Sequence, residues 1–575
     1  GDREMIKNKF KYLLLLFFYF LPFNLFAQDV ILDALNQEAT RAKENLRIEG
    51  SEKPYFICYN IYDVREIDIE SSYGGLTKSK NKLSRNGQVE IRVGDYSFDN
   101  TNYSLSPVTI MKGRFQLPIE DDLFAIKYEL WQITDQQYKA ALDEFAQKKA
   151  GLQNRTFSEK VDDFSKEEPV VLIEKKNDYD IDVKILEQKA LKYSALFKKF
   201  PYIQKSVVNI KGKKGNEYFL NTEGTKIRKP VNEFVIEIVA TAIDKKGNSY
   251  SDYITVFVND QKDFPKDEEM EKKIESLAKK LDNTLKAPFA EDYIGPVLFS
   301  NEASANFFAQ LLSKSLSGKP AMLSPGSNQS QLIRKIGRKI FPDFVNVYDD
   351  PLTTEYKGIK LIGSYKVDDE GVKAQKVNIV ENGVLKNLLM CRKPSSKVTN
   401  SNGHGRKSLN KKVEPRPANV FISSSQPKSY EELKSSLIKM CKEMDLEYGI
   451  IVKRISDVAV FYDNVSSFGT LLPSSKSNEL FVSYPIEVYK IYAKDGKEEL
   501  VRGCNFANIS LKLLKDIVAM GNDEFVYNFI NKGNSGDLPT AFIAPSFIID
   551  DFEIVAEKDQ NKKPYFMKSP VFSEK

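Results

Sequence analysis

The chain of 575 residues is long enough for two domains, each with its own hydrophobic core. Its hydrophobic content of 41% and charged content of 29% are typical of a globular protein that folds in water. The formal net charge of +5 is small for this length. It argues against a dedicated nucleic-acid-binding protein, which would carry a strong basic surplus on one face.

The first residues are typical of a secretory signal peptide. Met5 is interpreted as the initiator, with residues 1–4 as an upstream remnant. A lysine-rich start leads into an apolar run over residues 12–21, and the small residue Ala27 follows. This order predicts cleavage near Ala27 or Gln28, and therefore an exported protein, periplasmic or secreted, with no membrane association after cleavage. The alternative is an uncleaved anchor, although the run is short for a membrane span.

Helical and strand patterns alternate in the first half of the chain. Apolar residues recur at helical spacing over residues 29–50 and 134–150, and Thr134 with Gln137 predicts a capping box for the second helix. Gly74, Gly75, Asn86 and Gly87 are predicted as turn residues between the first two strands. A charged helix within residues 263–290 is expected to bridge two domains. Strands are predicted over residues 55–64, 89–93, 207–210, 217–221, 234–243 and 253–258.

The second half is richer in strand patterns. A strand over residues 295–299 leads into a helix that begins at Ser300 or Asn301 and ends by Gly318. The pair Asn382-Gly383 predicts a hairpin, and a further helix is expected over residues 509–520. The class is therefore α+β, with an N-terminal α/β-mixed domain followed by a mainly-β C-terminal domain. The expected boundaries are signal peptide 1–27, N-terminal domain 28–262, bridging helix 263–290 and C-terminal domain 291–565.

Side chains that could hold a metal are scarce. His404 is the only histidine, whereas a catalytic zinc site usually takes three protein ligands, commonly with two or more histidines. The tripeptide Gly403-His404-Gly405 is typical of a mobile loop, which is a poor support for a catalytic base. The four cysteines are dispersed, and the sequence leaves open whether they form disulfides or buried thiols. They are Cys58, Cys391, Cys441 and Cys504.

Residues 392–416 form a polar and basic segment. The segment lacks aromatic residues that could stack on bases, so nucleic-acid binding is disfavoured. One interpretation is a solvated loop. The other is a loop that borders a peptide-binding cleft, with Asn402, Gly403, His404 and Arg406 as the candidate contact residues.

Several stretches, taken in order, resemble the TldD/PmbA family of metallopeptidase-related proteins. The resemblance covers most of the chain after the signal peptide and is strongest from Gly295 to Asp523. It implies the two-domain TldD/PmbA-like fold. The matching stretches include GPVLF (295–299), GSYKVDDEGVKAQKVNIVENGVLKNLL (363–389), NGHGR (402–406), PRPANVFI (415–422) and AMGND (519–523).

In the zinc-bearing branch of this family, the predicted helix after residue 300 would carry the motif H-E-x-x-x-H. Laid on this chain, the motif puts Ala309 and Lys314 at the two histidines and Gln310 at the glutamate that acts as general base. A further zinc ligand of the family, a cysteine in a G-x-C-G loop, corresponds to Ser535. Alanine has no ligand atom, lysine repels a dication, and glutamine cannot accept a proton from zinc-bound water. The resemblance thus implies no catalytic residue and no cofactor in this chain.

The resemblance also implies a partner. Family members without the zinc motif, the PmbA or TldE branch, act with a zinc-bearing TldD subunit in a two-subunit peptidase that cleaves unfolded or extended peptides. We therefore expect a heterodimer with a zinc-bearing paralogue, or alternatively a homodimer, and a peptide substrate. Two other hypotheses stay open: an active metallopeptidase with a non-standard metal site, built on His404 and cysteines, and a stand-alone peptide-binding or scaffold protein.

Overall fold

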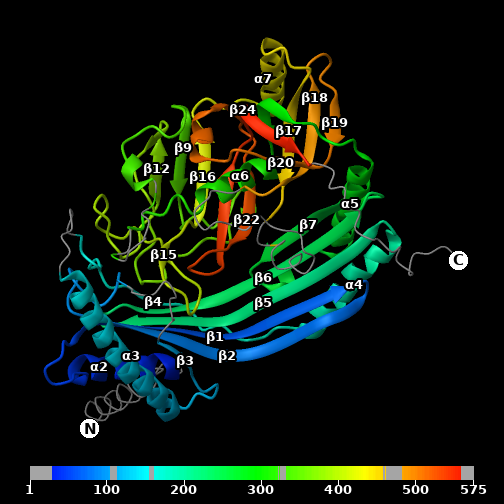
Figure 1. The fold of residues 1–575 in the computed structure, drawn as a ribbon. Coiled ribbons are helices and arrows are strands. Elements are labelled where there is room, and N and C mark those ends of the chain that lie inside the picture. The colour runs from blue at the N-terminus through cyan, green and yellow to red at the C-terminus, as the bar shows by residue number, and fades with distance from the viewer. Residues whose placement is uncertain are drawn as a thin grey trace, which may run out of the picture.

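The computed structural model describes residues 29–103, 113–153, 161–320, 323, 330, 332–457, 460 and 482–557. The predicted signal peptide and its cleavage position lie outside these residues. None of the described helices is long and apolar enough to cross a membrane. The predicted α+β class is confirmed, with a sheet-rich N-terminal part below a mainly-β C-terminal domain (Figure 1).

A curved seven-stranded sheet forms the N-terminal part (Figure 1). Its strand order is β3-β2-β1-β5-β6-β4, and β7 also pairs with β6. Four antiparallel strands of 18 or 19 residues run side by side through the sheet. They are far longer than the mean strand of about five or six residues. The bounds are β1 (Pro54–Ser72), β2 (Gly75–Val93), β3 (Arg114–Gln116), β4 (Val171–Ile173), β5 (Ile203–Asn221), β6 (Lys226–Ile243) and β7 (Ser249–Val258).

Two pairs of helices pack against opposite ends of this sheet (Figure 1). Helices α2 and α3 share one hydrophobic cluster with β1 and β2, whereas α4 and α5 share another with β5 and β6. The predicted bridging helix is α5, which buries Met270 and Ile274 against the sheet. Its Lys280 Nζ also lies 3.0 Å from a carboxylate oxygen of Glu487 in the C-terminal domain. The bounds are α2 (Val30–Asn45), α3 (Leu123–Leu152), α4 (Val183–Ala195), α5 (Asp267–Lys286) and the short 3-10 helices η1 (Leu196–Lys199) and η2 (Gln261–Asp263).

The C-terminal domain consists of two larger sheets around one buried helix, α6 (Glu302–Leu312). The first sheet has the order β19-β18-β17-β8-β24-β20, with β21 pairing β24, and the second has the order β13-β12-β9-β16-β23-β22. Helix α7 (Tyr430–Glu443) packs on the far face of the first sheet, against the residues of its strands that alternate with those facing α6.

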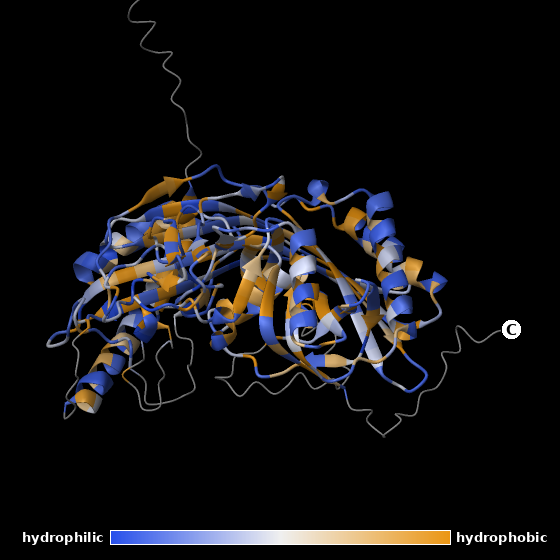
Figure 2. Cartoon of the chain, turned by 90° about the horizontal axis from the view of Figure 1, so that it is seen from above, coloured by the Kyte–Doolittle hydropathy of each residue, from blue (hydrophilic) through white to orange (hydrophobic). Residues whose placement is uncertain are grey.

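Hydrophobic and hydrophilic residues are interspersed along the strands and helices of both domains (Figure 2). Alternation of this kind lets one face of an element pack on the core while the other stays polar. The strand bounds of the two larger sheets are β8 (Tyr293–Phe299), β9 (Val345–Asp349), β12 (Val377–Glu381), β13 (Val384–Leu385), β16 (Asn419–Ser424), β17 (Tyr448–Ile455), β18 (Pro485–Tyr492), β19 (Glu498–Val501), β20 (Cys504–Phe506), β21 (Ile517–Met520), β22 (Phe525–Asn531), β23 (Leu538–Ala544) and β24 (Phe547–Ala556). Shorter elements are β10 (Glu355–Tyr356), β11 (Ile359–Lys360), β14 (Gly405–Arg406), β15 (Glu414–Pro415), η3 (Ile333–Lys335) and η5 (Leu511–Lys515).

The helix predicted over residues 134–150 is only the second half of α3. The helix begins at Leu123, and Asp122 is its N-cap. The Asp122 carboxylate accepts a hydrogen bond from Ala125 N at 2.8 Å. Thr134 lies inside the helix, where its hydroxyl donates to Leu130 O at 2.6 Å. The predicted capping box is therefore wrong, because a hydroxyl bonded within the helix does not cap an end.

Asn86-Gly87 lies inside β2 and not in a turn. Gly87 is opposite Phe115 of β3, and a Cβ atom added to this glycine would meet the Phe115 ring at 2.3 Å. The glycine therefore serves close packing across two strands. The turn of the hairpin is at Tyr73-Gly74, where both residues have positive φ, so the turn predicted at Gly74 is confirmed.

The helix predicted over residues 509–520 is also wrong. Leu511–Lys515 forms only a short 3-10 helix, and Ile517–Met520 is strand β21, which pairs with β24. The apolar spacing of this segment fits either a helix or a strand, and pairing with β24 favours the strand. The hairpin predicted at Asn382-Gly383 is confirmed, with φ of 47° and 75°.

Ion pairs join the two domains. Arg392 of the C-terminal domain is 1% exposed, and its guanidinium donates to both carboxylate oxygens of Glu223, at 2.7 and 2.8 Å. The same group donates to Ser165 O at 2.6 and 3.1 Å. Farther along the sheet, Arg454 pairs with Asp252 of β7. Bidentate pairing fixes orientation as well as distance, so these contacts set how the C-terminal domain lies over the sheet.

We predict that Arg392→Ala lowers the free energy of unfolding by about 3–5 kcal/mol, because it leaves the Glu223 carboxylate largely buried and unpaired. Urea unfolding followed by circular dichroism measures this loss. Lys397→Ala is the matched control, since this lysine is exposed on the same segment, and its effect should stay within about 0.5 kcal/mol. Equal effects of the two substitutions would contradict the role given to Arg392.

Candidate functional site

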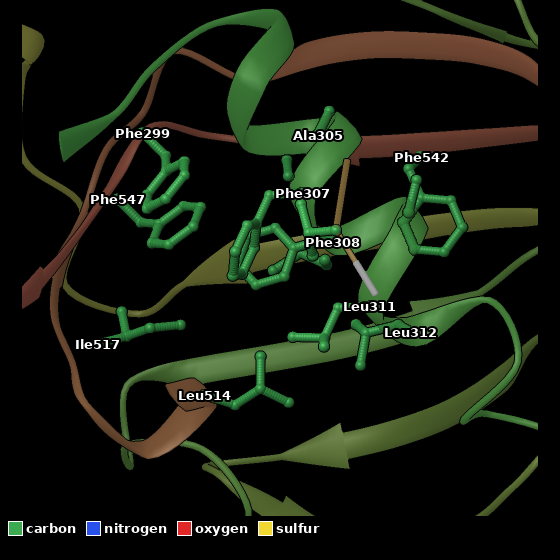
Figure 3. Packing of buried hydrophobic residues seen from close by; sticks show 14 of the residues in the cluster. Phe299, Ala305, Phe307, Phe308, Leu311, Leu312, Leu514, Ile517, Phe542 and Phe547 are labelled. Carbon is green, nitrogen blue, oxygen red and sulfur yellow. The ribbon is translucent and has the colours of Figure 1, made fainter. Parts of the chain in front are cut away.

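Helix α6 is the centre of the candidate site, because the resemblance places the zinc motif there. Every residue from Ala303 to Ala309 is buried. Phe547 packs against the helix, with its ring centre 4.6 Å from that of Phe308 and 5.0 Å from that of Phe299 (Figure 3). The helix is therefore an element of the hydrophobic core on more than one side.

The start of α6 is tied to the N-terminal sheet. Glu302 accepts a hydrogen bond from the Tyr253 hydroxyl at 2.5 Å and from Arg454 Nε at 3.2 Å. A carboxylate is also favoured at this end of a helix by the helix dipole. Burial holds the pKa of Tyr253 well above its usual value, so this hydroxyl stays a donor at neutral pH. The helix is thus positioned by both domains.

Ala309 and Gln310, two positions of the aligned motif, are part of the packing. Ala309 is 0% exposed and lies in the main hydrophobic cluster of the domain. The Gln310 Nε2 group lies within hydrogen-bond distance of Asn306 Oδ1, Ser456 O and Ser483 Oγ, at 2.7, 3.0 and 2.9 Å. Its Oε1 accepts from Ser483 N at 2.8 Å. The amide therefore joins α6 to the segments that follow β17 and precede β18, and its acceptor oxygen is already used.

The other two positions lie apart from these. Lys314 is exposed, just after the end of α6. Ser535 is 0% exposed in the connection between β22 and β23, where its Oγ accepts from Arg416 Nη1 at 3.2 Å. Arg416 Nη2 donates to Asn531 O at 2.9 Å. Burial lowers the pKa of Arg416 to about 10, so this guanidinium still carries its charge at neutral pH.

His404 is buried and not on an exposed loop. The side chain is 0% exposed, and its Nδ1 lies 2.9 Å from Asn402 O. Its Nε2 lies 3.5 Å from Asp349 Oδ1 and has no hydrogen-bond partner among the described residues. Gly403 is also buried, with φ of 71°. The mobile loop expected from the flanking glycines is therefore wrong.

The candidate peptide-contact residues are brought together, but inside the domain. Asn402 bonds Leu388 O and Met390 N through its amide, both at 2.8 Å. Arg406 donates to Pro417 O and Pro539 O, at 2.7 and 2.9 Å. Their role at a cleft stays a prediction. The solvated loop expected for residues 392–416 is wrong for much of the segment, whose buried members include Arg392, Ser395, Ser401, Asn402, His404, Arg406, Lys407 and Arg416.

Thiols offer no alternative metal centre. The four cysteines are unpaired and buried, which resolves the question that the sequence left open in favour of buried thiols. Burial raises the pKa of Cys58 and of Cys504 to about 12, so both stay protonated at neutral pH. Within the described ranges, no group of three or more His, Cys, Asp and Glu side chains could hold a metal ion.

Two acidic side chains near Gly405 were missed by sequence reasoning. Asp368 Oδ2 accepts from Gly405 N at 2.9 Å, and Glu370 Oε2 accepts from Arg392 N at 2.6 Å. Burial and the nearby Glu370 charge raise the pKa of Asp368 well above its usual value. Burial likewise raises the pKa of Glu370 to about 6. The run DDEG gave no spacing signal, because the partners come from other parts of the chain.

Sequence comparison places the C-terminal domain in a known family. Residues 292–556 match the family described as the PmbA/TldA metallopeptidase C-terminal domain. A metalloprotease of Methanocaldococcus jannaschii is 39% identical over 108 residues, 18% of this chain and 22% of that protein. A metalloprotease of Methanothermobacter thermautotrophicus is 33% identical over 100 residues, 17% of this chain and 20% of that protein. The aligned segments span about a fifth of these relatives.

Solved structures share the whole fold. TldE from Thermococcus kodakarensis covers 91% of this chain and 100% of its own, with a TM-score of 0.56 and 14% identity. A Thermotoga maritima protein described as a candidate modulator of a DNA gyrase covers 91% and 99%, with a TM-score of 0.57 and 18% identity. Fold and matched domain together define a metallopeptidase-related protein. The C-terminal domain belongs to the TldD/PmbA family, and the whole chain shares the fold of TldE.

We predict that Gln310→Glu, which restores the glutamate of the motif, lowers the free energy of unfolding by about 1–3 kcal/mol at pH 7. A carboxylate oxygen would then face Asn306 Oδ1 and Ser456 O in place of a donor. Urea unfolding measures the change, with Lys314→Ala as an exposed control expected within about 0.5 kcal/mol. A fully tolerated Gln310→Glu would mean that the site is not closed around an amide.

The raised pKa of Glu370 predicts a pH-dependent stability. Its unfolded pKa is lower than its folded pKa of about 6, so the folded state holds the proton more tightly. Stability should fall as pH rises from about 4.5 to about 6.5, by about 2 kcal/mol from this group. Glu370→Gln should remove this part of the slope in unfolding titrations at several pH values. An unchanged slope would contradict the assignment.

Proposed function

We propose that this chain is the zinc-free, non-catalytic subunit of an exported two-subunit peptidase that acts on unfolded or extended peptides. Membership in the TldD/PmbA family supplies the class of reaction. The names of the archaeal relatives, metalloproteases, agree with that class. The zinc-free assignment is supported by the residues at the motif positions, which are Ala309, Gln310, Lys314 and Ser535.

The observation that carries the proposal is the hydrogen bonding of Gln310. A general base in a zinc peptidase needs a free acceptor oxygen that faces a metal-bound water. The Gln310 side-chain oxygen accepts a hydrogen bond from Ser483 N, and the side-chain nitrogen donates to Asn306 Oδ1. The residue at the position of the general base therefore serves the packing of the domain.

Charge supports the same assignment at the other end of the aligned site. The Arg416 guanidinium lies 3.2 Å from Ser535 Oγ, the position of the family's zinc-binding cysteine. Its charge persists at neutral pH, because burial lowers its pKa only to about 10. Like charges repel more strongly inside a protein than in water. A dication beside this group is therefore disfavoured.

A non-catalytic subunit contributes through its surfaces. The zinc-bearing paralogue would supply the metal and the general base, and this chain would complete the space that holds the peptide. The predicted signal peptide supports the proposal that this assembly acts in the periplasm or outside the cell.

The proposal predicts a specific partner. The native chain, purified from its host through an affinity tag, should carry an equimolar paralogue that contains H-E-x-x-x-H, and cleavage of denatured casein should need both chains. Replacing the motif glutamate of the paralogue by glutamine should abolish cleavage, whereas Lys314→Ala in this chain should leave the rate within about twofold. Cleavage by this chain alone, or purification without any such paralogue, would overturn the proposal.

A further inference from the structure

The N-terminal sheet ends at a short strand, β3, beside helix α3 (Figure 1). Among the described strands, β3 pairs only with β2. It is therefore an edge strand, and one of its two sides is not used by the sheet. The opposed residues of β2 and β3 are Asn86 and Gln116, Gly87 and Phe115, and Gln88 and Arg114.

The hydrogen bonds on either side of β3 show which main-chain groups face outward. Gly113 O accepts from Val89 N, and Leu117 N donates to the strand opposite it. Bonded and non-bonded pairs alternate along an antiparallel ladder, so Phe115 is the residue of β3 that bonds to β2. The N–H and C=O groups of Arg114 and Gln116 then point away from the sheet. Unpaired edge groups of this kind can accept a further strand.

A groove of about 580 Å³ opens beside this edge. That volume lies in the usual range for ligand sites, about 300–1,000 Å³. Helix α3 forms one wall, and Asn410 of the C-terminal domain reaches the groove from the other domain. Asn410 O accepts from Arg114 Nη2 at 3.1 Å, whereas its buried Oδ1 has no hydrogen-bond partner among the described residues. The lining residues that matter here are Asn86, Arg114, Gln116, Gln132, Gln136 and Asn410.

The lining matches the chemistry of a peptide main chain. Five of its side chains are carboxamides, and each offers both a donor and an acceptor, as a peptide group does. Phe115 and Ile133 add apolar contacts. Arg114 and Glu129 bring one charge of each sign, so the groove has no charge surplus that would select a strongly charged ligand.

We propose that the groove beside β3 binds an uncharged, extended peptide segment as an added strand, with main-chain bonds to Arg114 and Gln116 and side-chain amides around it. The peptide class of ligand rests on the proposed function. The site itself needs neither zinc nor a partner subunit. It lies in the N-terminal sheet and is separate from the aligned zinc positions.

The test uses a dodecapeptide of alternating Thr, Gln, Val and Asn, with fluorescein attached to its N-terminus and its C-terminus amidated. Its binding to the purified mature chain is measured by fluorescence anisotropy. The same peptide, N-methylated at every second residue, keeps its side chains but loses the donors of one edge. It should bind at least about tenfold more weakly. Equal affinities overturn the proposal, as does binding of maltohexaose with no measurable binding of the unmodified peptide.

A protein variant tests the same bonds from the other side. Gln116→Pro removes one outward N–H that β2 does not use, and proline is tolerated at sheet edges. It should weaken binding of the unmodified peptide at least about tenfold. Gln147→Ala, exposed on the same helix α3 but outside the groove, is the matched control and should leave binding unchanged. Unchanged binding by Gln116→Pro overturns the proposal.

Two further measurements keep the outcome clear. If circular dichroism shows that Gln116→Pro does not fold, the double variant Gln132→Ala and Gln136→Ala takes its place, with the same expected loss. A dimer of the wild-type chain that dissociates in Gln116→Pro would identify a second copy as the occupant and overturn the proposal. Failure here would leave the zinc-free assignment standing, since metal content and partner are measured independently of this groove.

Discussion

The C-terminal domain depends on the burial of helix α6 between two sheets. The apolar side of this helix is packed by an aromatic cluster, and its polar side chains are bonded to neighbouring segments. The Gln310 side chain, for example, is hydrogen-bonded to Asn306, Ser456 and Ser483. Side chains in such a position must either be apolar or have their hydrogen bonds satisfied, because an unpaired polar group in the interior is costly. This constraint explains how the helix can be retained without residues that bind zinc.

The position of the helix also depends on the contact between the domains. Arg454 bonds both Asp252 of the N-terminal sheet and Glu302 at the start of α6. At the other side of the interface, Arg392 holds Glu223 with two hydrogen bonds. Charges of this kind are stable inside a protein only when they are paired and hydrogen-bonded. The polar, basic segment that looks solvated in the sequence is therefore largely interior. Arg392 meets Glu223 of the other domain, whereas Arg406 and Arg416 donate to carbonyl groups of their own domain.

Features governed by local chemistry could be predicted from the sequence. The amphipathic spacing of α2, the Asn382-Gly383 hairpin and the apolar stripe of α6 were all recognised. Helix α7 was missed, although Ser429 and Glu432 form a capping box at its start. Helix α6 ends at Leu312, although the sequence signal for its end lies at Gly318. The length of β1 and β5 arises from pairing across the sheet, which a single strand does not reveal.

The candidate site likewise has features that the sequence predicts and features that it does not. The substitutions at Ala309 and Gln310 can be read from the sequence once the family frame is recognised, but their hydrogen bonds and burial cannot. Arg416 beside Ser535, the acidic pair Asp368 and Glu370, and the groove beside β3 each join residues that are far apart in the chain. Such sites follow from the fold, and no motif predicts them.

The central proposal is that this chain carries no catalytic zinc. Elemental analysis of the purified mature chain, after dialysis against metal-free buffer, tests it most directly. The account predicts no bound zinc in the isolated chain, and zinc only when the H-E-x-x-x-H paralogue is present. Tightly held zinc at about one ion per isolated chain would contradict the account, since a structural or catalytic zinc site usually takes three or four protein ligands.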